Sequence, residues 1–557
     1  MNFVETILGN LEKSTADPAV IEVYGQTSAP TTRAQLKEMV ERARVYLATA
    51  GVRAGDRVAL LAPNSTRWVA CDIAILASGA ICVPLYSRQD PKELAYIARD
   101  CQPKLLIAGD ETLAEAIRRE WETPSAIVTF EKIFTAENRP AEIHKITPEE
   151  PVTIVYTSGT SGDPKGAVIT CGNVDYMLHQ TISRLRQATG RDTTTDRVFH
   201  FLPVCFMGSR IMLWTQLYRG NPVMLSTDLS NLVQEVATAD PNYYLNVPAV
   251  LERIRNGVNA KLKEKGGVAL RLYKKGEAAY HRRLRGEGRR IDNVWFRLAT
   301  AMVFCKIRLK IGKSLEFLIC GSAALTEETQ RWFEMIGVRV LQVYGLTETT
   351  AIVTMDQPNS VKAGYVGHAV EGCEAKITGE GELICRGPNI FAGYWNKPEA
   401  TEAVLRDGWL YTGDLAEADE TGNWKIIGRA KNVLIPMSGH NIAPEPIEQQ
   451  LIDACPGMEH AVIIGHGRPY LTAIVTGKMD NASVERAIES VNESLPHYKK
   501  IRKFRRFERG FTIDNGLLTA NQKLKRQQIE DQLKQEIESL YLESEAGQGG
   551  KGAFANA

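Results

Sequence analysis

The chain has 557 residues, of which 44% are hydrophobic and 24% charged, and its formal net charge is +1. One hydrophobic core rarely organises more than about 250–300 residues, so several subdomains are expected, and the balanced charge favours no nucleic-acid partner. The ten cysteines form no CxxC pair, which is typical of reduced thiols in a cytoplasmic protein and predicts no zinc site. The N-terminus lacks a signal-peptide pattern and no window reaches the ~18 apolar residues of a membrane span, so any membrane contact is expected to be peripheral.

Helix and strand patterns alternate along the first three quarters of the chain. Thr32 and Gln35 are placed as a capping box that begins a helix. Short buried-strand patterns at 57–63 and 79–85 flank a helical pattern at 66–78, which is the order of a βαβ unit. Each later recurrence ends in glycines and hydroxyl residues, where open α/β sheets place their ligands. These recurrences are at 151–159, 315–325 and 338–348.

The pattern changes near Gly428, where a strand leads through a polar turn into a helix. We therefore predict an α/β fold with a large N-terminal domain of βαβ-type subdomains and a small mobile α+β C-terminal domain. In the small domain we expect strands at 460–467 and 470–477, a helix after Ser483 and a charged helix from Leu524 to Leu542. The predicted division is an N-terminal domain over 1–428, a hinge over 429–433, the small domain over 434–543 and a disordered tail over 544–557.

Positive charge is concentrated in one segment. Between Lys261 and Lys313 there are 16 Lys/Arg and 4 Asp/Glu, a local charge of +12 that leaves −11 for the rest of the chain. A solvated helical surface is the simpler interpretation. A docking surface for an anionic partner, such as a membrane, coenzyme A or an acidic carrier protein, is the alternative.

The stretch YTSGTSGDPKG, at 156–166, has the composition of a phosphate-binding loop. Glycines let the backbone approach oxyanions closely, and hydroxyl groups and turn N–H groups add donors. It is not a Walker loop, because Pro164 precedes Lys165 and Gly166 follows it, where that motif needs Ser or Thr. The sequence therefore predicts a phosphate site of another kind.

Four further motifs follow this loop in order: YGLTETT (344–350), YTGDL (411–415), GRAKNVLIPMSGHNIAPEPIE (428–448) and LTANQKLKR (518–526). With the loop they resemble the adenylate-forming superfamily over residues 32–542. A helical basic insertion at 247–312 makes the resemblance strongest to the AMP-forming long-chain fatty acyl-CoA synthetases. The resemblance implies an ATP- and Mg²⁺-dependent ligase that converts a medium- or long-chain fatty acid, or a similar lipophilic acid, to acyl-AMP and pyrophosphate, then transfers the acyl group to coenzyme A.

The resemblance also implies roles for individual residues. The loop from Thr157 to Lys165 would close on the β- and γ-phosphates, and Thr157 and Glu348 would ligate magnesium. Lys523 would offset the repulsion between the substrate carboxylate and the α-phosphate, with Lys525 as the neighbouring alternative. The catalytic set is thus Lys523, Glu348, Thr157 and Lys165.

The nucleotide and thiol sites follow from the same motifs. Tyr344 would stack on adenine, Asp414 would accept hydrogen bonds from the ribose, and Arg429 would close on the ribose or phosphate. Lys431 occupies the hinge position, and Gly439 would line a tunnel for the thiol after domain rotation. The binding set is Thr157, Ser158, Gly159, Thr160, Ser161, Gly162, Lys165, Gly321, Ser322, Ala323, Gln342, Val343, Tyr344, Gly345, Thr347, Asp414, Arg429, Lys431 and Gly439.

The acyl pocket departs from the pattern of the superfamily. Phe206 stands where many acyl-CoA synthetases have His, Ser209 where many have Glu, and Gln522 replaces the glycine before the catalytic lysine. An apolar pocket predicts a hydrophobic acid but discriminates poorly between chain lengths. The predicted pocket wall comprises Phe206, Met207, Gly208 and Trp214.

Three alternatives remain open. An acyl-AMP ligase that loads an acyl carrier protein would use the basic segment as a dock, and an aryl-CoA ligase would use Phe206 and Gly208 to shape a flat slot. A binding protein that retains the fold without turnover is the alternative outside enzymes. This last alternative is disfavoured because the chain has all five of the residues that turnover would require, namely Lys165, Glu348, Asp414, Arg429 and Lys523.

Overall fold

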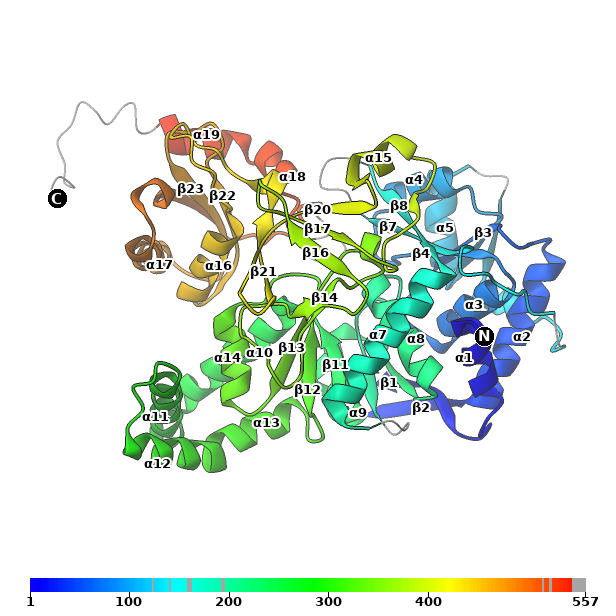
Figure 1. The fold of residues 1–557 in the computed structure, drawn as a ribbon, viewed down its shortest axis with the longest axis horizontal. Helices are drawn as coiled ribbons and strands as arrows, with labels where there is room; N and C mark the ends of the chain where they lie inside the picture. Colours follow the sequence, from blue (N-terminus) through cyan, green and yellow to red (C-terminus); the bar gives the residue numbers. More distant parts are fainter. Residues whose placement is uncertain are drawn as a thin grey trace.

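The fold is α/β, with a large N-terminal part and a smaller C-terminal part beside it (Figure 1). Two mainly parallel sheets form most of the large part, and helices fill the space between them. The predicted fold class is therefore confirmed, whereas the mobility of the small part stays a prediction. The computed structural model describes residues 1–122, 125–139, 142–157, 163–191, 196–512, 515–519 and 523–542.

One sheet contains the βαβ unit predicted near the N-terminus. Strands β3 (Arg57–Leu61) and β4 (Ile81–Leu85) pair in parallel, and the connecting helix α3 (Thr66–Ala77) is buried along almost its whole length. The helix begins at the predicted place because Ser65 caps it, accepting a hydrogen bond from the backbone N–H of Trp68 (3.2 Å). The strand order is β18 (Gly393–Tyr394), β8 (Lys165–Thr170), β7 (Pro151–Thr157), β4, β3, β5 (Leu105–Ala108) and β6 (Ala126–Thr129).

The other large sheet brings the carboxyl ends of several strands to one edge. Strand β12 (Phe317–Cys320) lies in parallel between β11 (Tyr243–Asn246) and β13 (Arg339–Tyr344). All four residues of β12 are buried, as expected for a strand covered on both faces. The strand order is β15 (His368–Ala369), β14 (Thr354–Met355), β13, β12, β11, β9 (Val198–His200), β10 (Val223–Ser226), β1 (Pro18–Tyr24) and β2 (Thr27–Thr32).

Helices α3, α7 (Cys171–Thr189) and α8 (Met207–Arg219) contribute to the same hydrophobic core as strands of both sheets. A fully buried ion pair between Arg210 of α8 and Asp72 of α3 fixes their relative position. Such a pair is costly to break, because either partner alone would leave a buried charge. The remaining helices of these layers are α1 (Phe3–Leu11), α2 (Arg33–Thr49), α4 (Pro91–Cys101), α5 (Glu111–Glu120), α6 (Phe130–Ile133), α9 (Leu232–Ala239) and α14 (Glu327–Met335).

The capping box at the start of α2 is present, with Thr32 and Gln35 exchanging side-chain and backbone hydrogen bonds as predicted.

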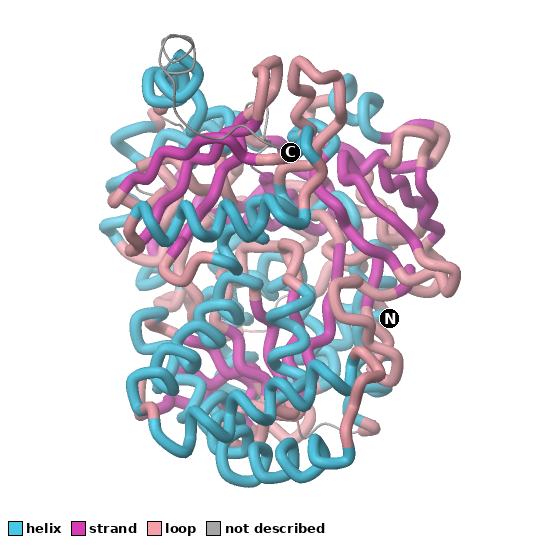
Figure 2. The backbone as a smooth tube through the Cα atoms, turned by 90° about the vertical axis from the view of Figure 1, so that its left-hand side faces the viewer, coloured by secondary structure: helices cyan, strands magenta, loops and turns pink. Residues whose placement is uncertain are grey.

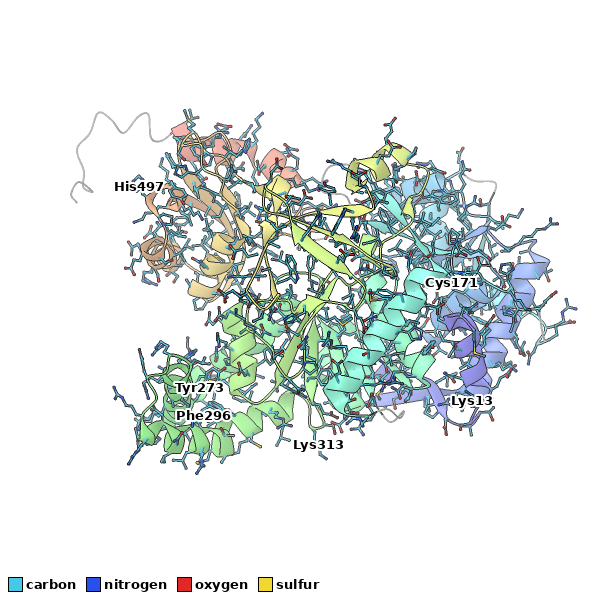
Figure 3. The ribbon with its side chains drawn as sticks, viewed as in Figure 1. Lys13, Cys171, Tyr273, Phe296, Lys313 and His497 are labelled. Atoms are coloured by element: carbon cyan, nitrogen blue, oxygen red, sulfur yellow. The ribbon has the colours of Figure 1, made fainter. Side chains whose placement is uncertain are left out.

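A helical arm extends from the large part at the lower left of Figure 1. Tyr273 and Phe296, labelled in Figure 3, lie within this arm. Gly276 permits its tight packing, since a Cβ there would lie 2.4 Å from the Cβ of Ala299. The arm and its connections comprise α10 (Pro248–Lys265), α11 (Gly267–Leu284), α12 (Arg290–Ala299), the π-turn η2 (Thr300–Phe304) and α13 (Cys305–Ile311).

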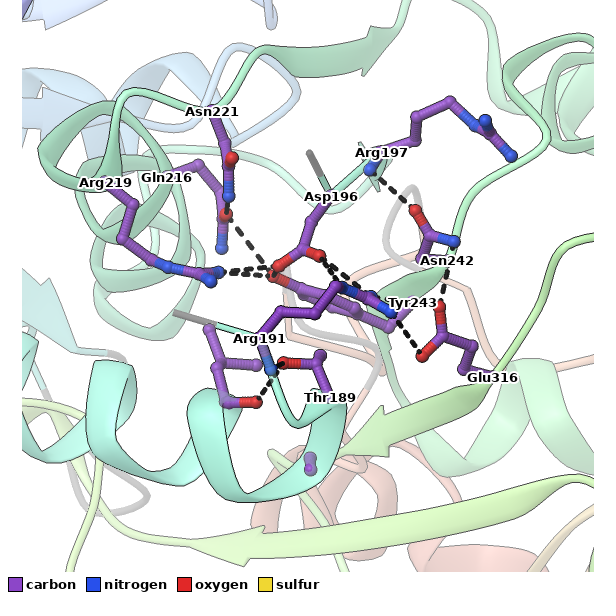
Figure 4. Close-up of polar contacts among 12 residues, drawn as sticks. Thr189, Arg191, Asp196, Arg197, Gln216, Arg219, Asn221, Asn242, Tyr243 and Glu316 are labelled. Atoms are coloured by element: carbon purple, nitrogen blue, oxygen red, sulfur yellow. Dashed lines mark hydrogen bonds and ion pairs between the residues drawn. The ribbon is translucent and has the colours of Figure 1, made fainter. Parts of the chain in front are cut away.

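A buried polar network joins the end of α8 to strand β11 and to the segment before β12 (Figure 4). The fully buried carboxylate of Asp196 accepts hydrogen bonds from Arg219 (2.8 Å), Tyr243 (3.1 Å) and Arg191 (2.9 Å). Arg191 also binds Glu316 through two bonds of 3.2 and 3.0 Å. Because this buried charge has several partners, the network holds the sheet that supports the cleft.

A smaller sheet connects the large part to the C-terminal part, with order β16 (Glu374–Ile377), β17 (Glu382–Arg386), β20 (Trp409–Ala418) and β19 (Leu405–Arg406), and with β21 (Trp424–Arg429) paired to β20. The C-terminal part has its own sheet, β22 (Met458–Ile464), β23 (Leu471–Gly477) and β24 (Ile501–Phe507). Its core packs against α16 (Glu445–Ala454) and α17 (Asn481–Ser494). Figure 2 shows this three-stranded sheet above the helical arm.

The last helical region differs from the prediction. Leu524 forms a β-bridge with Leu518, and the predicted continuous helix is two helices, α18 (Arg526–Gln532) and α19 (Lys534–Leu542), separated at Leu533. The two helices nevertheless pack together, because Ile529 and Ile537 on either side of the break belong to one hydrophobic cluster. Helix α17 likewise begins two residues before Ser483, capped by Asp480. The predicted tail, 544–557, lies outside the described residues.

Candidate active site

A cleft with a volume of about 3330 Å³ lies between the two parts of the molecule. Most of the predicted site residues line it, although they come from stretches far apart in the sequence. The loop residues Ser158, Gly159, Thr160, Ser161 and Gly162 lie outside the described residues. The predicted residues that line the cleft are Thr157, Lys165, Phe206, Met207, Gly208, Gly321, Ser322, Ala323, Gln342, Val343, Tyr344, Gly345, Thr347, Glu348, Asp414, Arg429, Lys431 and Lys523.

Two glycines form the floor of the cleft at the ends of parallel strands. Gly321 follows β12 and Gly345 follows β13, so both stand where an open sheet places ligands. A Cβ on Gly345 would lie 2.2 Å from the carbonyl oxygen of Ala351, and one on Gly321 would lie 2.8 Å from Val343. Glycine is therefore required at both positions for the backbone to pack this closely where it lines the cleft.

Asp414 connects two predicted nucleotide-binding residues. Tyr344 donates a hydrogen bond from its hydroxyl to Asp414 Oδ2 (2.6 Å), and Arg429 Nε lies 2.8 Å from Asp414 Oδ1. Asp414 and Arg429 face each other across the paired strands β20 and β21, which explains their contact. Burial raises the pKa of Asp414, while Arg429 and then the Tyr344 hydrogen bond lower it. The group is thus held as an acceptor facing the cleft.

Glu348 has a partner that the motifs do not reveal. The hydroxyl of Tyr394 donates to Glu348 Oε1 (2.7 Å), and the Lys165 ammonium lies 5.4 Å from the centre of the Tyr394 ring. Burial, followed by the charge of Glu348, raises the pKa of Tyr394, so it remains a donor at neutral pH. Tyr394 was missed because it belongs to the two-residue strand β18, outside every motif. The pairing of β18 with β8 brings Tyr394 beside Lys165, the first residue of β8.

Lys523 points toward the acidic side of the cleft. Two hydrogen bonds with Thr519 hold its backbone: the Lys523 N–H donates to Thr519 Oγ1 (3.1 Å) and the Thr519 N–H donates to Lys523 O (2.8 Å). Its ammonium is attracted by Asp414 and Glu348 and repelled by Arg429. Desolvation by the surrounding walls of the cleft lowers the pKa of Lys523 most, and the charge of Arg429 lowers it further. The residue nevertheless stays accessible to water from the open side of the cleft.

Lys525, the alternative to Lys523, has a different partner. Its Nζ lies 3.3 Å from Glu93 Oε1 of α4, so it pairs across the interface between the two parts of the molecule. Lys523 is therefore the lysine that faces both Asp414 and Glu348. The ion pair of Lys525 helps to hold the C-terminal part in this position.

A second contact across this interface involves the carboxyl groups of Glu252 and Asp453. Gln449 of α16 donates to Glu252 Oε1 of α10 and to Asp453 Oδ1, each at 3.4 Å. Burial and then the charge of Asp453 raise the pKa of Glu252 to about 7. Burial and then the charge of Glu328 raise the pKa of Asp453 to about 6. This contact is therefore favoured when the carboxyl groups are protonated.

Three predicted site residues lack either the place at the cleft or the free polar group that their predicted roles require. Gln342 lines it, but its amide nitrogen donates to Gln330 (2.7 Å) and to the carbonyl of Tyr365 (2.9 Å). Gly439 lies on the exposed surface of the C-terminal part with φ of +76°, away from the cleft. Its role after rotation stays a prediction.

Trp214 is the third, and its predicted place in the pocket wall is corrected. It is fully buried, its Nε1 donates to Asp72 Oδ2 (2.8 Å), and its ring packs on Phe3 at 5.1 Å. Position along the helix explains the difference, because Trp214 lies about 10 Å further along α8 than Met207, where the helix is buried on all sides.

The other predicted pocket residues lie where α8 begins. Phe206 packs against the ring of Tyr86 at 5.5 Å, and the nearest atom to a Cβ on Gly208 would be Ala351 Cβ at 3.9 Å. Gly208 thus leaves open space at this point. Beyond it the cleft continues between α9, α10 and α13 along mainly apolar side chains, among them Leu232, Val236, Tyr244, Val250, Ile254, Val258, Val303 and Ile307.

The donors fit a magnesium ion that arrives with phosphate ligands. Thr157 and Glu348 offer a hydroxyl and a carboxylate, the oxygen donors that a hard cation prefers. Among the described residues, no group of three His, Cys, Asp or Glu side chains is arranged to hold a metal. Oxygen atoms of a bound triphosphate would have to complete the coordination.

Two protein families match this chain. Residues 10–395 match the AMP-binding enzyme family, and residues 431–545 match the AMP-binding enzyme C-terminal domain. The chain belongs to the AMP-binding enzyme family. The predicted membership of the adenylate-forming superfamily is thereby confirmed. The unmatched residues between the two families, 396–430, end within the predicted hinge at 429–433, and Lys431 is the first residue of the second match.

Individual relatives of this family agree with that assignment. Long-chain-fatty-acid–CoA ligase FadD15 of Mycobacterium bovis is 28% identical over 565 residues and 92% of each chain. Long-chain-fatty-acid–CoA ligase ACSBG1 of Bos taurus is 27% identical, over 90% of this chain and 79% of its own. The adenylation domain of a carboxylic acid reductase from Segniliparus rugosus, solved with AMP and a co-purified carboxylic acid, shares the fold with a TM-score of 0.79 at 20% identity, over 98% of this chain and 94% of its own.

Among the described residues, no helix combines the length and apolar character needed to cross a membrane.

Proposed function

We propose that this protein is an AMP-forming acyl-CoA synthetase for medium- or long-chain fatty acids or similar lipophilic acids. One observation carries the proposal. Lys523, the Asp414–Arg429 pair and Glu348 converge on one end of a cleft whose other end is apolar and extends between the helices of the insertion. A polar, cation-bearing end suits a nucleotide triphosphate, and an apolar end suits an acyl chain.

In the first half-reaction the substrate carboxylate attacks the α-phosphorus of ATP, and pyrophosphate leaves. Two anions must approach each other, so pre-placed positive charge lowers the barrier. Lys523 bridges the approaching carboxylate and the α-phosphate. Lys165, held beside the Tyr394 ring, stabilises the charge that develops on pyrophosphate. Magnesium held by Thr157 and Glu348 would supply further charge neutralisation at the phosphates.

The remaining polar groups orient the nucleotide. Asp414 accepts from the ribose hydroxyls and Arg429 closes on the ribose or phosphate, while Tyr344 packs on the adenine. Tyr394 orients Glu348 by its hydrogen bond (2.7 Å). These contacts would hold the reacting groups in line, and such positioning together with electrostatic stabilisation accounts for most of the catalysis of phosphoryl transfer.

In the second half-reaction Lys523 would have to leave, because a lysine placed at the carboxylate and the α-phosphate would obstruct the approach of a thiol to acyl-AMP. Rotation about Lys431 would withdraw Lys523 and bring Gly439 to the site. The charges around Lys431 support a hinge at this residue. Burial lowers the pKa of Lys431 most, and repulsion by the nearby cations of Arg429 and Lys165 lowers it further. Movement of the C-terminal part would relieve this crowding of cations.

The acceptor is proposed to be coenzyme A, and the protein to act in the cytoplasm. An acyl carrier protein is the alternative acceptor, and an aryl acid the alternative substrate. Pyrophosphate release across a panel of fatty and aromatic acids, measured with and without coenzyme A, tests all three. Release that depends on fatty acids, with acyl-CoA as product, is expected. Absence of acid-dependent release across the panel would contradict the proposal.

A further inference from the structure

The outer surface of the helical arm carries exposed apolar residues at helical spacing. From Arg290 to Ile311 the chain is continuously helical through α12, η2 and α13. One side packs into the core through Phe296 and Phe304, whose rings lie 5.9 Å apart. The exposed apolar side chains are Ile291 (51% exposed), Val294 (49%), Leu298 (41%), Met302 (51%) and Leu309 (52%).

The polar residues among them are basic. Between residues 289 and 313 there are seven Lys/Arg and one acidic residue, Asp292. Asp292 is buried and accepts a hydrogen bond from Arg282 Nε (3.1 Å), so it does not present its charge to solvent. Lys313, labelled in Figure 3, lies at the lower edge of the molecule where this segment ends. The exposed charge of the segment is therefore uniformly positive.

The apolar end of the cleft opens beside this surface. Met302, Lys306 and Lys310 line the cleft, and Met302 is also one of the exposed apolar residues. Val233 of α9, which lines the same end, is 80% exposed. The route for an acyl chain thus ends at an exposed surface that is both apolar and basic.

We propose that the surface from Arg290 to Lys313 docks on an anionic lipid membrane and lets a fatty acid pass from the membrane into the cleft. The combination of apolar side chains with interspersed Lys/Arg on one helix is what binds a helix in the plane of an anionic interface. The segment from Ile291 to Leu309 is roughly 27 Å long at 1.5 Å per residue, long enough to lie along such a surface. The passage of the acid rests on the proposed function, whereas docking itself does not.

A lipid surface explains features that an acidic carrier protein does not. Charge alone would satisfy an acidic protein, but half-exposed Leu, Ile, Val and Met side chains spread along the helix need an apolar medium. A long-chain acid is also poorly soluble in water, and direct transfer avoids exposing its methylene groups.

Sedimentation of the full chain with vesicles tests docking without any substrate. Vesicles of phosphatidylcholine with 30% phosphatidylglycerol are expected to bind the protein at least 10-fold better than vesicles of phosphatidylcholine alone, and 0.5 M salt should weaken binding. Replacement of Val294 and Leu298 by Ser should reduce binding about 10-fold. The matched control, Ile143→Ser with Ile377→Ser, changes two exposed apolar residues outside the arm and should bind normally.

Substitution of Arg290, Arg297 and Arg308 by Gln tests the charge, and should abolish the preference for anionic vesicles. Equal binding to both vesicle types, no binding to either, or full binding by the Ser and Gln variants would each overturn the proposal. Binding to an acidic carrier protein but not to vesicles would also overturn it, and would assign this surface to a protein partner.

A second measurement separates docking from catalysis. Pyrophosphate release is compared for palmitate embedded in anionic vesicles and for water-soluble octanoate. The Val294/Leu298 Ser variant should lose activity several-fold with embedded palmitate and retain it with octanoate. Vesicle binding without release for any acid would remove the proposed function and leave docking intact. Pyrophosphate release without vesicle binding would leave the proposed function intact and overturn the docking proposal.

Discussion

The two ends of the cleft are built by different means. The nucleotide end relies on directional polar contacts between residues at strand ends, such as Tyr344 to Asp414 (2.6 Å) and Tyr394 to Glu348 (2.7 Å). The acyl end relies on apolar side chains of helices, which exclude water without fixing individual atoms. Directional contacts leave a signature in particular residue types, whereas apolar packing accepts many equivalents. A single substitution should therefore lower activity strongly at the nucleotide end, whereas at the acyl end it should change activity and selectivity by smaller steps.

The largest effect is expected from Lys523→Ala at the nucleotide end. Loss of one pre-placed charge in such a site typically lowers the rate by about 10²–10³-fold. Acyl-AMP formation should fall by this amount, while transfer from supplied acyl-AMP to coenzyme A should change little, because Lys523 leaves before that step. Single-turnover assays of each half-reaction measure the two rates.

Lys525→Ala is the matched control, two residues away. It removes a partly exposed ion pair with Glu93, and such pairs contribute about 0–1 kcal/mol. Equal losses in both half-reactions for Lys523→Ala, or equal losses from the two lysine variants, would refute the distinction between them.

Asp414→Asn should have the next largest effect. It weakens a hydrogen bond and an ion pair of a buried charged group, by roughly 1.5–3 kcal/mol in total, so kcat/KM for ATP should fall roughly 10- to 150-fold. Steady-state kinetics with ATP as the varied substrate measure the change. The exposed Asp407, replaced by Asn, is the control and should leave kcat/KM unaltered. A loss that appears for the fatty acid and not for ATP would place Asp414 at the wrong end of the cleft.

At the acyl end, Gly208→Leu should alter selectivity more than rate. A Cβ fits there, with its nearest neighbour at 3.9 Å, but a longer side chain would enter the cleft. Since a misfitted methylene costs about 1–3 kcal/mol, kcat/KM for long acids should fall at least ~10-fold relative to short ones. Gly208→Ala is the control and should change selectivity little. Parallel losses for long and short acids would show that the acyl chain does not pass Gly208.

The smallest effect concerns pH and the interface between the two parts of the molecule. The pKa values of Glu252, about 7, and Asp453, about 6, are raised in the docked arrangement, so protonation stabilises it. This stabilisation is complete below the ordinary carboxyl pKa and is lost as the pH rises through about 6 to 7. Hydrogen exchange around Lys431 should therefore be a few-fold faster at pH 8 than at pH 5.5. Glu252→Gln should reduce that difference.

Glu264→Gln, on the exposed side of the same helix α10, is the control for this pH dependence and should retain it. An unchanged pH dependence in Glu252→Gln would show that the acid contact does not govern docking.

The sequence predicted local features better than long-range contacts for physical reasons. The capping box at Thr32, the α3 helix and the glycines at 321 and 345 follow from local chemistry, and the structure contains each. Tyr394 could not be predicted, because a two-residue strand brings it to Glu348 only through long-range pairing. Trp214 was misplaced because an apolar residue in a buried helix faces either a pocket or a core, and only the packing around the helix decides which.

The division of the last helix has the same origin. Its periodic pattern predicted one helix, but α18 ends at Gln532 and α19 begins at Lys534, with Ile529 and Ile537 in one hydrophobic cluster. Local propensity indicates that a segment is helical, while tertiary packing decides where it bends.

A crystal structure with a non-hydrolysable fatty acyl-AMP analogue tests the central claim most directly. We expect the adenosine between Tyr344 and Gly321, its ribose within hydrogen-bonding distance of Asp414, and the acyl chain running past Gly208 toward Met302. An analogue bound elsewhere, or an acyl chain directed away from the insertion helices, would contradict the account of how this cleft joins a nucleotide to a fatty acid.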